Sequence, residues 1–294
     1  MSLTAIIVLT LKLSIALSVF ALGTKETLSD ATFLFRRPEK LLNALVSMYI
    51  AMPLFAVTLA LAFDFPQAVK IALVALSVSP IPPILPGKAL RAGGRESYAI
   101  GLLVAGSLLS IILVPLAMEL FQVVFNIPLQ MTPRAVAGVV MSSVLLPLAA
   151  GMAVRSLAPG FAERIGSPIS ITATVLLVAA FVPVLISQGG QLLALVSGGT
   201  FAALAAFAVF GLFIGHILGG PRFEERTVLA LYSSARHPGV ALAIAQANFP
   251  QQRVAMAAIL LALLIAAVVS LPYLNWVRHH KPGEPTHTGR GARI

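Results

Sequence analysis

The stretch "LALYSSARHPGVALAIAQANFP", Leu229–Pro250, places an arginine, a histidine and a Pro-Gly pair inside a segment that otherwise resembles a membrane-spanning helix. Proline removes a backbone donor and clashes with the preceding turn, so Pro238 and Gly239 predict a break in this helix. Backbone groups freed at membrane depth are tolerated only beside protein or a wet cavity. Arg236, an ionisable residue at this depth, is therefore a candidate functional residue.

A similar break lies earlier in the chain, in "LSVSPIPPILPGKALRAGG", residues 76–94. Its closely spaced prolines exclude a continuous helix there. Isolated kinks are one explanation, because proline is common in membrane helices. However, each break leads through a short link into a long apolar segment, and paired broken spans of opposite orientation predict an inverted-repeat secondary transporter with its site at the crossing.

The composition indicates a membrane protein. Of 294 residues, 59% are hydrophobic and 10% are charged, whereas soluble chains carry about 25% charged residues. The Lys and Arg residues fall in loops and at span ends, which is explained by membrane topology and argues against nucleic-acid binding. The sequence has no cysteine, which excludes disulfides and thiolate metal sites.

Hydropathy predicts an all-α polytopic membrane protein of nine transmembrane helices, of which the third and eighth are broken. The predicted spans are Leu3–Leu22, Leu41–Phe63, Ala68–Ala92, Glu96–Phe125, Arg134–Ala158, Ile169–Ser187, Phe201–Leu218, Arg226–Asn248 and Val254–Val277. Basic residues concentrate in alternate connections, so we expect an outside N-terminus and a cytoplasmic C-terminus in a bacterial inner membrane. Residues 1–278 form one predicted transporter domain, and residues 279–294 a flexible cytoplasmic tail.

Several stretches resemble the bile acid:sodium symporter family, over most of the chain. They are "FALGTKETLSDATFLFRRPEKLLNALVSMYIAMPL" (20–54), "SPIPPILPGKALRAGG" (79–94), "MSSVLLPLAAGMAVR" (141–155) and "SSARHPGVALAIAQANF" (233–249). The resemblance implies inverted repeats, with a core domain around the crossing third and eighth spans and a panel domain from the first, second, sixth and seventh. It also implies alternating-access transport of amphipathic organic anions with sodium coupling.

The chain departs from the family where the resemblance implies sodium ligands. Sodium needs several hard oxygen ligands, and the family supplies them as hydroxyl, carboxamide and carboxylate side chains. The aligned positions here hold Leu85, Pro86, Ala99, Leu103, Tyr232 and Arg236. Sodium coupling through the family's usual sites is therefore not expected, and no other cofactor is indicated.

Arg236 takes the place of a glutamine that binds sodium in the family, and two roles are open to it. It can act as a permanent cation or bind the carboxylate or sulfonate of a substrate in bidentate geometry. Alternatively, it can neutralise the helix-end carbonyls freed by Pro238 or pair with a buried acid. His237 is either a proton-coupling group or a hydrogen-bonded structural residue. Ser233 and Ser234 either line the cavity or bond their own backbone.

The other candidate residues also carry alternatives. Lys88 lies either at the first break, as part of the site, or at the cytoplasmic membrane surface, where it anchors the helix. Lys12 either contributes to the substrate path or extends its side chain to the outer membrane surface. Gln246 and Asn248 are candidate polar linings. The remaining candidates are the proline and glycine residues of the two breaks: Pro82, Pro83, Pro86, Gly87, Pro238 and Gly239.

These features favour a secondary transporter of small or amphipathic organic anions, working by alternating access. The alternative is a membrane protein that binds or senses a ligand on the same fold without transporting it. The sequence shows no paired carboxylates, metal-ligand spacing or nucleophile with an evident base, so we do not expect an enzyme. The expected partners are a small organic anion and the lipid bilayer, with the protein a monomer or a weak homo-oligomer.

Overall fold

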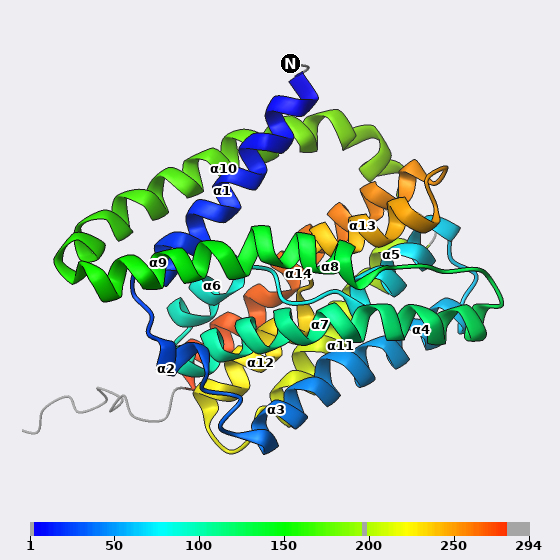
Figure 1. The fold of residues 1–294 in the computed structure, drawn as a ribbon. Coiled ribbons are helices and arrows are strands. Elements are labelled where there is room, and N and C mark those ends of the chain that lie inside the picture. The colour runs from blue at the N-terminus through cyan, green and yellow to red at the C-terminus, as the bar shows by residue number, and fades with distance from the viewer. Residues whose placement is uncertain (1–2, 196–198, 281–294) are drawn as a thin grey trace, which may run out of the picture.

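The computed structural model describes residues 3–195 and 199–280, which are helical and contain no strand (Figure 1). The helices of the first half are α1 (Leu3–Gly23), α2 (Leu28–Ala31), α3 (Pro38–Leu45), α4 (Met52–Ala62), α5 (Gln67–Val78), α6 (Leu85–Arg91) and α7 (Glu96–Phe125). Those of the second half are α8 (Pro133–Val140), α9 (Leu146–Leu157), α10 (Pro159–Leu195), α11 (Thr200–Leu218), α12 (Phe223–Ser234), α13 (Pro238–Asn248) and α14 (Arg253–His279). Two π-helical turns, η1 (Val46–Ala51) and η2 (Met141–Leu145), join α3 to α4 and α8 to α9. The predicted tail lies outside the described residues from 281 onward.

Both predicted breaks are confirmed. Seven helical stretches of the described chain are long and apolar enough to cross a membrane. They are Ile6–Gly23, Pro38–Ala62, Glu96–Phe125, Pro133–Leu157, Pro159–Ser187, Thr200–Leu218 and Val254–His279. The third and eighth predicted spans are instead pairs of shorter helices, because α5 and α12 have 12 residues each, α13 has 11 and α6 has 7. A total of nine spans, with each pair counted once, stays a prediction.

The sixth predicted span, Ile169–Ser187, lies within a longer helix. Helix α10 has 37 residues and continues through Pro168 and Pro183. At 1.5 Å per residue it is about 55 Å long, which exceeds the roughly 30 Å hydrocarbon core of a bilayer. Hydropathy misses its first turns because they contain Glu163 and Arg164.

The packing corrects the predicted panel domain. Helix α1 packs against α9 and α10, which correspond to the fifth and sixth predicted spans and lie with α1 at the upper left of Figure 1. The second and seventh spans pack around the breaks instead, since η1 and α4 contact α11, and α11 contacts α12. We call α1, α9 and α10 the three-helix group, and α2–α7 with α11–α14 the crossing group.

Two glycines explain why the seventh span belongs to the crossing group. A Cβ atom added to Gly211 of α11 would lie 2.5 Å from the Cα atom of Ser234, and one added to Gly215 would lie 2.5 Å from the carbonyl oxygen of Leu229. Glycines four residues apart share one helix face and allow membrane helices to approach closely. Helix α11 therefore lies against the backbone of α12, directly beside the second break.

Candidate functional site at the helix crossing

The two breaks meet in space. Helix α5 ends at Val78, and α12 ends at Ser234. The backbone N–H of His237 donates a hydrogen bond of 2.8 Å to the carbonyl oxygen of Pro80, which joins the two interruptions directly. Helix α5 packs against α13, and α6 packs against α12. The first half of each broken span therefore lies against the second half of the other, which is the arrangement of two spans with opposite orientation.

Arg236 lies at the centre of the crossing and is 1% exposed. Its Nη1 donates to the carbonyl oxygen of Ser79 at 3.3 Å, and its Nη2 donates to those of Ser77 at 3.0 Å and of Met48. Ser77 and Ser79 are at the C-terminal end of α5, where the helix dipole places negative charge. The guanidinium is thus directed at carbonyl groups of the first break and of η1, rather than at those freed by Pro238. A role of Arg236 in binding substrate stays a prediction.

The π-helical turn explains why the carbonyl group of Met48 is free to bind Arg236. The N–H of Met52 donates to the carbonyl oxygen of Ser47, five residues earlier. In the same pattern the partner of Met48 is Pro53, which has no N–H. The Met-Pro pair therefore leaves one main-chain acceptor of the second span open, and the guanidinium occupies it. Tyr49 of the same turn lies beside Arg236, with the guanidinium carbon 5.9 Å from its ring centroid.

His237 has both ring nitrogens engaged. Its Nδ1 accepts the backbone N–H of Gly239 at 3.1 Å and so caps α13. Its Nε2 lies 3.1 Å from the Oγ of Ser143, which donates its own proton to the carbonyl oxygen of Val139. Nε2 is therefore the donor to Ser143, and the ring is neutral with one tautomer. Because a second proton on Nδ1 would remove the cap, the geometry favours the structural alternative for His237.

The two serines before Arg236 differ in their partners. The Oγ of Ser233 lies 2.7 Å from the Oγ of Ser47, so it links α12 to the π-helical turn η1. The Oγ of Ser234 donates to the carbonyl oxygen of Leu231 at 3.0 Å, within its own helix. Both residues are buried, and their hydroxyl groups are directed at protein atoms.

The residues at the implied sodium positions do not fit a sodium ion. Leu85, Ala99, Leu103 and Tyr232 belong to one buried hydrophobic cluster. The hydroxyl group of Tyr232 donates to the carbonyl oxygen of Ala99 at 3.2 Å, so it also occupies a main-chain oxygen. No group of three or more His, Cys, Asp or Glu residues that could hold a metal occurs within residues 3–195 and 199–280.

The remaining candidates lie around the first break or away from the crossing. Lys88 in α6 donates from Nζ to the Oγ of Ser270 on α14 at 2.5 Å. The side chain of Asn248 holds the loop after α7 through two hydrogen bonds with Gln130: its Oδ1 accepts the backbone N–H, and its Nδ2 donates to the backbone carbonyl oxygen. Gln246 and Lys12 are exposed, on α13 and α1. Of the other turn residues, three are buried, namely Pro82, Pro83 and Pro86, and three are half-buried, namely Gly87, Pro238 and Gly239.

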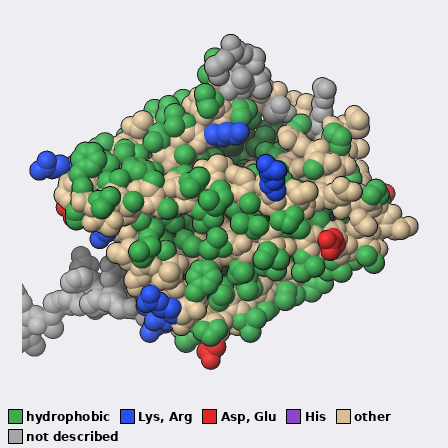
Figure 2. Space-filling model, in the orientation of Figure 1, with side chains coloured by type: hydrophobic (Ala, Val, Ile, Leu, Met, Phe, Trp, Pro, Cys, Tyr) green, Lys and Arg blue, Asp and Glu red, His purple; other side chains and the backbone are tan. Residues whose placement is uncertain are grey.

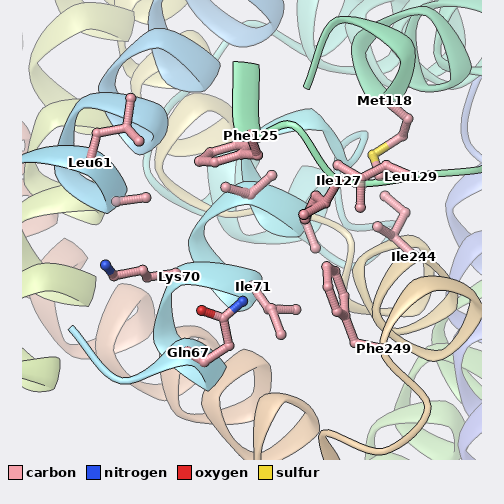
Figure 3. A pocket seen from close by; sticks show the side chains of 13 residues that line it. Leu61, Gln67, Lys70, Ile71, Met118, Phe125, Ile127, Leu129, Ile244 and Phe249 are labelled. Carbon is pink, nitrogen blue, oxygen red and sulfur yellow. The ribbon is translucent and has the colours of Figure 1, made fainter. Parts of the chain in front are cut away.

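Two openings lie outside the crossing. A pocket of about 270 Å³ is lined by apolar side chains of α4, α5, α7 and α13, with Gln67 and Lys70 as its polar residues (Figure 3). No predicted site residue lines it. Figure 2 shows a second hollow beside α1, with basic side chains near it. Lys12 and Arg134 are the basic residues of α1 and α8, and both are exposed.

Sequence reasoning missed the residues that hold the crossing from outside the breaks. They are Ser47, Met48 and Tyr49 in η1 and Ser143 in η2. Each π-helical turn is followed by a proline, at Met52–Pro53 and at Leu146–Pro147. These two prolines inside apolar spans were a usable signal, since a proline frees acceptors in the preceding turn.

Comparison with known proteins agrees with this architecture. The model of the sodium bile acid symporter family matches residues 12–195, more than half of the chain, and the matched region ends before the second break. No curated protein matches the chain. The apolar helices and the family match together show an integral membrane protein, and the family is one of transporters rather than enzymes. The chain belongs to the sodium bile acid symporter family, whose members transport bile-acid-like solutes across membranes.

Proposed function

We propose that this protein is a secondary transporter of small or amphipathic organic anions that works by alternating access. The main support is the hydrogen bond between His237 and Pro80, which joins two broken helices of opposite orientation. Broken spans that cross in this way form the sites of inverted-repeat transporters. The three-helix group beside the crossing group supplies a second body, against which the crossing can move.

The hollow beside α1 is the proposed entry for the substrate. Basic side chains lie near it in Figure 2, and α1 and α8 contribute the exposed cations Lys12 and Arg134. Such cations attract a carboxylate or sulfonate by long-range charge. The surrounding helices are largely apolar, which suits the body of an amphipathic anion.

The orientation follows from the basic residues. In Figure 1, α2 and α3 lie at the lower left and the bottom, and the turn from α9 to α10 lies at the left edge. The turn from α4 to α5 and the connection from α7 to α8 lie toward the right. The first set carries most of the Lys and Arg residues of these connections. By the positive-inside rule we place it in the cytoplasm, with the N-terminus outside.

In this proposal transport does not use sodium at the family's usual positions, because Arg236 supplies the positive charge at the crossing. The guanidinium binds the carbonyl groups of Met48, Ser77 and Ser79, and such oxygens are also hard ligands for a metal cation. Arg236→Gln would replace the guanidinium with one further oxygen. We expect this variant, unlike the wild type, to gain thermal stability from sodium chloride over choline chloride. Equal salt responses of the two proteins would contradict this role.

Uptake into proteoliposomes tests the transport function. Radiolabelled taurocholate and a set of small carboxylates and sulfonates would be offered to liposomes with and without the protein. Saturable, protein-dependent accumulation of any of these anions supports the proposal. Saturable binding to the detergent-purified protein without flux would instead establish the alternative, a ligand-binding or sensor protein on this fold.

A further inference from the structure

Glu26 is a buried carboxyl group that accepts no hydrogen bond from the residues that the structure describes. It lies in the turn between α1 and α2 and is 1% exposed. Neither carboxyl oxygen has a hydrogen-bond partner in the part of the chain that the structure describes. By contrast, the carboxylate of Asp30, four residues later, accepts hydrogen bonds from the hydroxyl and backbone N–H of Thr27. An ionised carboxylate buried without donors is very costly, so such a group favours its protonated form.

The groups around Glu26 are more negative than positive. Glu96 at the start of α7 and Asp30 on α2 bring negative charge, Arg155 on α9 brings positive charge, and Tyr232 on α12 is a neutral neighbour. Arg155 donates to the carbonyl oxygen of Thr24 at 3.4 Å rather than to a carboxylate. Burial first, and then Glu96 and Asp30, raise the pKa of Glu26 to about 8, while Arg155 lowers it.

Two ionised carboxylates cannot hydrogen-bond to each other, because both are acceptors only. If one of them is protonated, its O–H can donate a hydrogen bond to the other. Glu26 is close enough to Glu96 for a side-chain hydrogen bond of this kind. Glu96 is exposed at the surface, so it connects the buried carboxyl group to bulk water. A proton can therefore reach Glu26 without crossing apolar protein.

Glu26 lies where the two helix groups meet. The turn that carries it connects α1, of the three-helix group, to α2, which packs against α7 of the crossing group. Arg155 belongs to the first group, whereas Glu96 and Tyr232 belong to the second. A displacement of one group against the other would change both the access of Glu26 to water and its distance from Arg155.

We propose that Glu26 is a proton-binding site whose occupancy is linked to the relative position of the two helix groups. In the arrangement described here its carboxyl group holds a proton. When the junction opens, the O–H bond breaks, the proton passes to water, and the carboxylate becomes hydrated. If the protein is a transporter, as proposed above, this site couples anion movement to a proton gradient.

The sign of the pH dependence follows from the raised pKa. Below pH 4.5, the ordinary value, Glu26 is protonated in every state and has no effect on stability. Between pH 4.5 and about 8 the opened or unfolded protein loses a proton that the arrangement described here retains, so stability falls as the pH rises. Above about pH 8 the penalty is constant, since both states are ionised.

Infrared titration of the purified protein in nanodiscs tests the site without any transport. We expect a carbonyl-stretch band of a protonated carboxyl group that disappears with a midpoint near pH 8 and is missing in Glu26→Gln. Glu96→Gln should move the midpoint to lower pH and Arg155→Gln to higher pH, because these groups raise and lower the pKa of Glu26. The exposed Glu39, changed to Gln, is the matched control and should leave the band unchanged.

A band that persists in Glu26→Gln, or a midpoint unmoved by both neighbour variants, would overturn the proposal. If Glu26→Gln does not fold, the opposite shifts of Glu96→Gln and Arg155→Gln still decide it. Because this readout needs no flux, absence of transport would refute the proposed function and leave the proton site intact. If the transport function and the proton site are both correct, Glu26→Gln should lose anion uptake driven by a proton gradient and retain anion exchange.

Discussion

Replacing Arg236 with methionine tests the structure of the crossing most sharply. The change keeps a long side chain but removes the cation, so the carbonyl groups of Met48, Ser77 and Ser79 lose their donor. Each buried acceptor left without a donor costs about 1–3 kcal/mol, or roughly 3–9 kcal/mol for three. Methionine no longer requires burial of a guanidinium, which offsets several kcal/mol. We expect a net loss of about 2–4 kcal/mol.

Unfolding of the purified protein in detergent, followed by circular dichroism, measures this loss. Arg236→Lys should fall between the wild type and Arg236→Met, because an ammonium keeps the charge but cannot reproduce the planar fork. Arg134→Met, at an exposed arginine, is the matched control and should change stability by less than about 0.5 kcal/mol. An Arg236→Met protein as stable as the wild type would show that the guanidinium does not hold the crossing together.

Further predictions concern the contacts that support the crossing and the proposed substrate path. Gly211→Ala should destabilise the fold, because the added Cβ would lie 2.5 Å from the backbone of α12. Gly138→Ala is the control and should not destabilise it, because the space around Gly138 is open. Thermal unfolding compares the two variants. Ser143→Ala removes the acceptor of the histidine Nε2–H and should cost about 1–3 kcal/mol, measured by the same assay. Lys12→Gln combined with Arg134→Gln should raise the KM for anion uptake with less change in the maximal rate, and an unchanged KM would exclude these cations from substrate attraction.

The sequence predicted the breaks and the family because both depend on local signals. Proline at position 238 and the prolines of residues 76–94 interrupt a helix whatever surrounds them, and the structure interrupts both helices there. The hydrogen bond from His237 to Pro80 shows that the two interruptions are in contact, while their origin in inverted repeats stays a prediction. Apolar length likewise predicted most helix boundaries to within a few residues.

The partners of the site residues could not be predicted, because they come from distant parts of the chain. Arg236 is bound by Met48, which is 188 residues away, and neither residue type nor spacing indicates that pairing. The panel assignment failed for a related reason: it was carried over from the family by span number, whereas packing depends on side-chain size at Gly211 and Gly215. Glu26 was overlooked because a glutamate in a loop resembles a solvated residue until the fold buries it.

Counterflow of a radiolabelled organic anion in proteoliposomes shows whether the protein exchanges anions without sodium at the family's positions. Liposomes loaded with unlabelled anion would be diluted into labelled anion, in buffers with sodium or with choline as the main cation. We predict protein-dependent counterflow at equal rates in the two buffers. Counterflow that requires sodium would contradict the account, because it would place a sodium ion where the structure has Arg236 and Tyr232.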